Sequence, residues 1–256
     1  MKSLLMPLAG ITLLILTSCD KNGNGYETPP PPPPPPVNAT VFSAAGDSLG
    51  VAGKIADFRT AMGTGNIAIG WDGVPDDLSN ADNFPGDFFG NSDPNGPAGR
   101  KRGLVMNGAP AFRVSKQDFS EIEPSYDAQF NAFSKPKTFM SSGSVTSDMN
   151  FKVPGTLTPA FVKGFAVVFS DVDDANSTTL EFFNDTKSLG VYKAPVRVSE
   201  SGFSFLGVFF PDEKVTRVRI KSGAAPLGLG VKDKSDGGVD IVVMDDFFYN
   251  LPVSQQ

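Results

Sequence analysis

The chain has no histidine, one cysteine and one tryptophan in 256 residues. The absence of histidine excludes Ser-His-Asp and Cys-His nucleophilic sites and His-ligated zinc or iron. A single cysteine also excludes an intramolecular disulfide. What remains is chemistry by carboxylates, Tyr, Lys or Arg, oxygen-ligated metals such as Ca²⁺, and binding without catalysis.

The chain also lacks an apolar run long enough to span a bilayer, which takes roughly 20 residues. The apolar run at residues 4–16 follows Lys2 and leads to Cys19 through Thr17 and Ser18. This start resembles a bacterial lipoprotein signal peptide, in which a small residue precedes an obligatory cysteine. The resemblance implies removal of residues 1–18 and lipidation of Cys19, and so a membrane-anchored protein of the bacterial cell envelope facing the periplasm or the exterior.

A spacer is expected over residues 19–37, because residues 29–36 are eight consecutive prolines. Such a run adopts polyproline II and reaches roughly 25 Å at about 3.1 Å per residue. It could also bind a partner domain with an aromatic groove, but a stalk is the favoured interpretation. We expect no nucleic-acid partner, because the net charge is −6 and the basic residues 100–102 are an isolated triplet in a Gly/Pro-rich loop.

One helix is predicted over residues 48–62. Its apolar residues Val51, Ile55, Phe58 and Met62 follow helical spacing, and Asp47 or Ser48 can cap its start. Residues 63–108 are rich in Gly, Asn, Asp and Pro, and they predict a long loop with a short strand at 67–71.

Short strands dominate the second half of the chain. Thr216, Val218 and Ile220 alternate with Arg217 and Arg219, which is typical of a strand with one buried face. The expected strands are residues 151–153, 161–170, 178–183, 189–198, 203–210, 215–221 and 239–249. Strands joined by turns, with one helix and no βαβ rhythm, predict a mainly β protein. We expect an antiparallel two-sheet sandwich of jelly-roll type forming a single domain over residues 38–256.

Several strings also carry a resemblance to known proteins. They are residues 70–75 (GWDGVP), 88–89 (FF), 153–156 (VPGT), 164–173 (GFAVVFSDVD), 202–208 (GFSFLGV) and 243–247 (VMDDF). Together they are similar to a group of exported, largely uncharacterised bacterial β-sandwich proteins, distantly like carbohydrate-binding jelly rolls. The resemblance implies a surface or extracellular sandwich and carries no activity.

Two acidic segments are candidate metal ligands. Asp171 and Asp173 lie in an acidic turn that could offer oxygens to Ca²⁺, or could be a solvated β-turn. Asp245 and Asp246 interrupt an apolar strand, so one of them should point inward and need a cation or backbone donors. We expect Ca²⁺, if bound, to use Asp171 and Asp173, joined by one carboxylate of the Asp245–Asp246 pair.

Trp71 and Asp72 are the candidate ligand-binding pair. An exposed indole stacks on sugar rings and a neighbouring carboxylate accepts from sugar hydroxyls. In a chain this rich in Phe, however, the favoured place for Trp71 is the rim of the core, where it would anchor the long loop. A binding module for carbohydrate or another envelope or extracellular ligand, including a surface protein, leads the functional hypotheses. A structural envelope or matrix protein comes next, and a carboxylate-dependent glycosidase or lyase third, because no glutamate lies at a strand centre.

Overall fold

The computed structural model describes residues 37–255, so the expected signal peptide, Cys19 and nearly all of the stalk lie outside the described residues. The strands and the α-helix are β1 (Thr40–Gly46), α1 (Ser48–Ala61), β2 (Asn66–Ile69), β3 (Leu104–Asn107), β4 (Ala111–Ser115), β5 (Thr138–Ser142), β6 (Thr146–Phe151), β7 (Ala160–Phe161), β8 (Gly164–Ser170), β9 (Thr179–Asn184), β10 (Lys187–Lys193), β11 (Phe203–Phe209), β12 (Arg217–Lys221), β13 (Val243–Asn250) and β14 (Val253–Ser254). Short 3₁₀ helices span Asp76–Leu78, Ala98–Arg100, Pro124–Ala128 and Lys234–Asp236. None of the helices in this part of the chain is long and apolar enough to cross a membrane.

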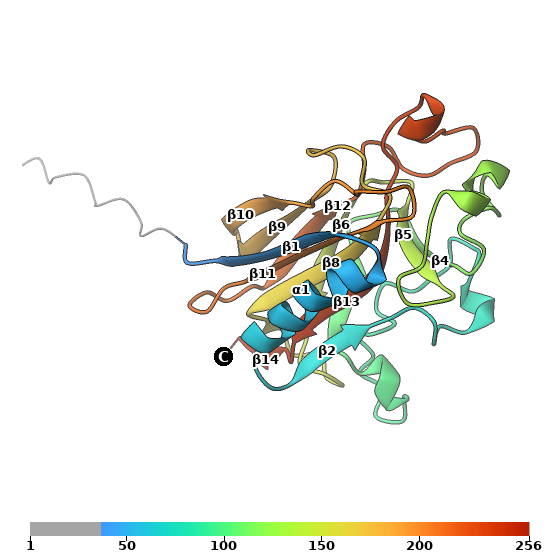
Figure 1. Ribbon diagram of the computed structural model, residues 1–256. Helices are drawn as coiled ribbons and strands as arrows, with labels where there is room; N and C mark the ends of the chain where they lie inside the picture. Colours follow the sequence, from blue (N-terminus) through green and yellow to red (C-terminus); the bar gives the residue numbers. More distant parts are fainter. Residues whose placement is uncertain (1–36, 256) are drawn as a thin grey trace, which may run out of the picture. The chain divides into compact units, whose positions relative to one another are not determined.

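Two antiparallel sheets form a sandwich (Figure 1). The seven-stranded sheet has the order β1-β11-β8-β13-β5-β4, with β2 also paired to β13. The five-stranded sheet has the order β10-β9-β12-β6-β3. Buried side chains from both sheets, such as Phe165 and Phe247 from one and Met149 and Phe182 from the other, form the core between them. The predicted class, a mainly β antiparallel sandwich with one helix, is confirmed.

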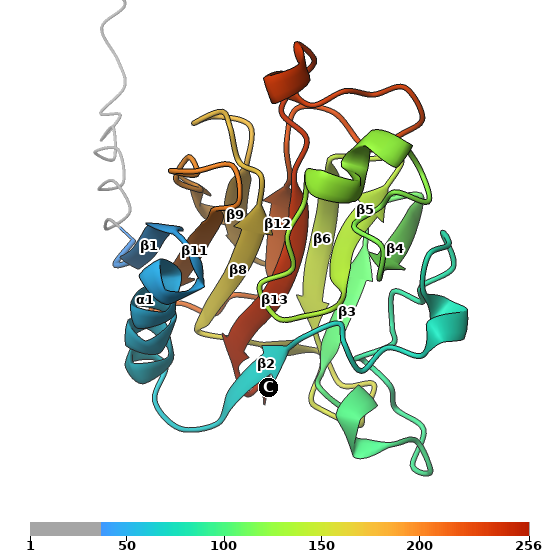
Figure 2. The ribbon, with the colours of Figure 1, turned by 45° about the vertical axis from the view of Figure 1, so that its right-hand side comes forward.

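Helix α1 covers part of the outer face of the seven-stranded sheet (Figure 2). The Asp47 side chain caps it by accepting from the Gly50 amide at 2.7 Å, as the capping preference predicts. A Cβ at Gly207 would lie 2.9 Å from the Phe58 ring, so the helix approaches β11 closely because that position is glycine. β8 is buried along its whole length because the core covers one side and α1 the other.

A second segment, residues 117–134, covers another part of the same outer face. Its Tyr126 hydroxyl donates to the Val231 carbonyl oxygen at 2.7 Å and ties the segment to the loop before β13. The outer face of the five-stranded sheet differs, because its outward side chains are exposed or half-buried, as with Arg217 and Arg219 on β12. This sheet therefore presents a polar face to solvent.

Four strands before residue 143 were not predicted, and β6 shares only Phe151 with the strand expected at residues 151–153. β1, β3, β4 and β5 lie where the sequence indicated a loop or no element. β3 has only four residues, and β1 is an edge strand with mostly exposed or half-buried side chains, so neither carries a clear local pattern. These strands form through pairing with distant partners, as β1 does with β11.

Candidate functional site

Trp71 lies in the core and not on the surface. It has no exposed surface, its Nε1 donates to the Asp245 carbonyl oxygen at 3.0 Å, and its ring stacks on Phe139 at 4.1 Å. The interpretation of Trp71 as a platform for a sugar ring is therefore wrong, because β2 ends at Ile69 and the chain then turns into the space between the sheets. Asp72 is exposed, and its carboxylate accepts from the Lys137 amide at 2.9 Å.

A β-bulge lies at Asp245 and Asp246. The register of β13 against β8 shifts between Met244 and Phe247. The bulge brings both carboxylates to one hydroxyl, since Ser134 Oγ lies 3.2 Å from Asp245 Oδ1 and 2.7 Å from Asp246 Oδ1. The expectation that the two side chains face opposite ways rested on strict strand alternation, which a bulge breaks.

Backbone amides, and not a cation, are the partners of the buried Asp245 carboxyl group. Asp245 Oδ2 accepts from the amides of Phe133 at 2.5 Å and Ser134 at 3.2 Å. Burial is the largest effect on this group and raises the pKa of Asp245 to about 9, with the neighbouring Asp246 charge adding to the rise. Because Asp245 has no exposed surface, it offers no group to a substrate or an ion.

The acidic residues that do converge are Asp171, Asp173 and Asp233. One carboxylate oxygen of each lies within 4.8 Å of the others, and these three could hold a metal ion. Asp171 and Asp173 belong to this group as predicted, but Asp233 replaces the expected Asp245–Asp246 pair. Asp233 comes from the loop before β13, where its carboxylate also accepts from the Ser235 amide at 2.8 Å.

A guanidinium already faces two of these carboxylates. Arg197 pairs with Asp171, and its Nε lies 2.6 Å from Asp173 Oδ1. The Arg197 side chain is only 8% exposed, so its charge is balanced mainly by these partners. Burial raises the pKa of Asp171 to about 7, against the lowering effect of its hydrogen bond from Gln129. The cluster is thus a buried ion-pair network with three carboxylates and one cation.

A neighbouring carboxylate shapes the acidic turn. Asp240 accepts from the amides of Asp173 at 3.1 Å and Asp174 at 3.0 Å, and from the Ser177 hydroxyl. These bonds hold the turn after β8 against the loop that leads into β13. The turn is therefore pinned by the protein itself and is not a solvated surface turn.

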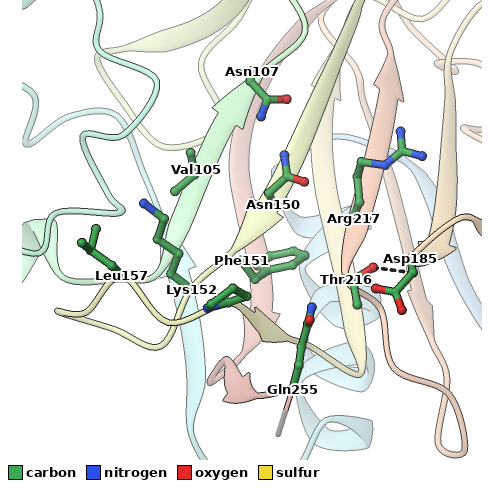
Figure 3. Close-up of a pocket in the computed structure, with 11 residues that line it drawn as sticks. Val105, Asn107, Asn150, Phe151, Lys152, Leu157, Asp185, Thr216, Arg217 and Gln255 are labelled. Carbon is green, nitrogen blue, oxygen red and sulfur yellow. Dashed lines mark hydrogen bonds between the residues drawn. The ribbon is translucent and has the colours of Figure 1, made fainter.

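A pocket of about 450 Å³ lies at one end of the polar face of the five-stranded sheet (Figure 3). Its lining residues are Val105, Asn107, Asn150, Phe151, Lys152, Leu157, Pro159, Asp185, Thr216, Arg217 and Gln255. They come from β3, β6 and β12, from the turn between β9 and β10, and from the segments around β7 and β14. No residue of this pocket was predicted from the sequence to be a site residue.

Several polar groups in the pocket have no partner in the described part of the chain. Asn150 Nδ2 is buried and makes no hydrogen bond with residues 37–255. The same holds for the side-chain charges of Lys152 and Asp185 in that range. The Thr216 hydroxyl, by contrast, is used inside the protein, because it accepts from the Asp185 amide at 2.7 Å and donates to the Phe183 carbonyl oxygen at 3.3 Å. These free groups are available to a ligand.

No protein-family model matches this chain, and no curated protein shows significant similarity to it. Functional inference therefore rests on the arrangement of these residues.

Proposed function

We propose that this chain is a membrane-anchored envelope lipoprotein that presents a non-catalytic β-sandwich binding module for carbohydrate or another envelope or extracellular ligand. The observation that carries the proposal is the pocket on the uncovered sheet face. It combines amide, ammonium and carboxylate groups without internal partners with apolar surface from Leu157, which is 71% exposed. Sugar recognition needs such donors and acceptors beside apolar contact. The two-sheet architecture supports a distant likeness to carbohydrate-binding jelly rolls as part of this proposal.

The pocket favours binding over hydrolysis. A carboxylate-dependent glycosidase needs two carboxyl groups roughly 5 to 9.5 Å apart across the scissile bond. Asp185 is the one carboxylate among the described lining residues. A structural envelope protein without a small ligand is the remaining alternative, and a glycosidase or lyase the third.

We expect the full chain, solubilised in detergent, to bind a subset of glycans on an array. Asn150→Leu should weaken that binding about tenfold or more, because it removes a buried donor that nothing inside the protein uses. Its thermal melt should match wild type for the same reason. A chain that binds no glycan would support the structural alternative, and release of reducing ends from polysaccharide pools would support the enzyme.

We expect mature protein to begin at a diacylglycerol-modified Cys19. Cys19→Ala should leave residues 1–18 attached, because the thiol that receives the lipid is the only one in the chain. Mass spectrometry of the mature N-terminus checks this. An unmodified Cys19 at the N-terminus of wild-type protein would contradict the lipoprotein assignment.

We propose Ca²⁺ as the ion that the Asp171, Asp173 and Asp233 cluster would take. Its donors are all carboxylate oxygens, which suit a hard cation. An ion there would compete with Arg197 for Asp171 and Asp173.

A further inference from the structure

We infer that the pocket on the five-stranded sheet selects an anionic glycan, holding the carboxylate of a uronic acid or a sulfate ester between Lys152, Asn150 and Arg217. This inference rests on the proposed function of a glycan-binding module and names its ligand class.

The strand register places the three donor side chains together. Asn150 on β6 pairs with Val105 on β3 and with Arg217 on β12, so it lies directly between them. Cross-strand neighbours of this kind have Cβ atoms about 5 Å apart. Lys152 follows two residues later on the same side of the strand, and Figure 3 shows it across the pocket from Arg217. The three donors thus border one space.

Asn150 and Lys152 lack internal acceptors in the part of the chain that the structure describes. Asn150 Nδ2 is buried without a partner within residues 37–255, and a buried donor left unpaired destabilises the fold. Lys152 has no ion pair in the same range. Such groups point to an acceptor supplied from outside.

Arg217 is held in place while most of its donors stay available. Its guanidinium carbon lies 3.7 Å from the centre of the Phe183 ring, which fixes the plane of the group. It makes one 3.3 Å contact with Asp148. That carboxylate is engaged more closely by Arg219, at 2.8 and 3.0 Å. Arg217 therefore adds positive charge to the pocket.

An anionic ligand fits the remaining features of the pocket. Phe151 is 3% exposed, so the pocket offers no open aromatic ring for stacking, and polar contacts must supply the affinity. Asp185, at the other side, can accept from a sugar hydroxyl. The chain as a whole carries a net charge of −6, which repels polyanions. Binding of an acidic glycan would thus require a local cationic site such as this one.

The test compares charged and neutral forms of the same polymers. Full-length protein in detergent is titrated with polygalacturonate and its methyl ester, and with dextran sulfate and dextran. We expect binding to one of the charged polymers and loss of binding to its neutral counterpart. The charged polymer that binds distinguishes a carboxylate from a sulfate ligand.

Matched variants locate the site. Lys152→Gln should weaken binding about tenfold or more, as loss of a charged hydrogen bond predicts. The control is Lys221→Gln, which also removes one lysine charge. Lys221 lies on β12, on the same outward face as Arg217 but outside the pocket, so its loss should leave the affinity unchanged. Equal losses in the two variants would overturn the pocket as the anion site.

The same measurements distinguish a wrong ligand class from a protein that binds no glycan. If the methyl ester or dextran binds as tightly as its charged form and binding still depends on Asn150, the ligand class is wrong and the glycan-binding module stands. If none of the four polymers binds and the glycan array is also blank, both proposals fall.

Discussion

Replacing Arg197 with Met should lower the free energy of unfolding by about 3–5 kcal/mol. The guanidinium is 8% exposed and is the cation that faces Asp171 and Asp173. Its removal leaves buried carboxylates without a counter-charge, which costs far more than the loss of a surface pair. Urea unfolding at pH 7 measures the change.

The matched control is Lys234→Met at the same end of the sandwich. Lys234 pairs with Asp174, but both side chains are nearly half exposed, so its loss should cost much less than the loss of Arg197. An Arg197→Met protein as stable as the control variant would show that Arg197 does not balance the cluster.

The same variant tests the ion site. Without the competing guanidinium, millimolar Ca²⁺ should raise the melting temperature of Arg197→Met relative to EDTA, and by more than it does for wild type. At a hundredfold excess over Kd the gain is about 2.7 kcal/mol. An equal shift after adding Asp171→Asn would place the ion elsewhere.

Stability should fall as the pH rises from about 4 towards 9, and Asp245 should be a main cause. Its folded pKa, about 9, lies above the unfolded value, so between these pH values the folded state keeps a proton that the unfolded state has released. A difference of one proton gives a slope of about 1.4 kcal/mol per pH unit. After burial, the charge of Asp246 is the next cause of the raised pKa of Asp245, and Asp72 in turn raises the pKa of Asp246.

Asp245→Asn should remove part of that slope. The difference between wild-type and variant unfolding free energies, measured by urea at pH 5 and pH 8.5, isolates this carboxyl from Asp171 and Asp240, whose pKa values are also raised by burial. Asp185→Asn, at an exposed carboxylate outside the core, is the control and should run parallel to wild type. If the unfolding free energy of Asp245→Asn changed with pH as much as that of wild type, Asp245 would not carry a buried proton in the folded state.

Local pattern was sufficient for several elements. The spacing of Val51, Ile55 and Phe58 predicted α1 and its buried face, because helical periodicity is visible in residues that are close together in the sequence. The alternation around Val218 and Ile220 likewise identified β12 and its inward side. Strand rhythm without βαβ units was enough for an antiparallel sandwich. The lipid anchor at Cys19 stays a prediction from the sequence.

Which residues come together in the sites depended on contacts between segments that are distant in the sequence. Asp171 and Asp173 were recognisable as neighbours, but Asp233, some 60 residues away, joins them only because its loop folds back beside the end of β8. The bulge at Asp245 and Asp246 likewise depends on pairing with β8. Neither is encoded in a local period.

The pocket shows the same division. The alternation of Ser147, Met149 and Phe151 with polar residues could have marked Asn150 as outward-facing on β6. Its neighbours Val105 and Arg217 follow only from the order β12-β6-β3 and from the register between those strands. Side-chain periodicity is a local property that a sequence displays directly. Strand order and register are set by burial of the whole core, so the tertiary structure alone decided which polar groups meet.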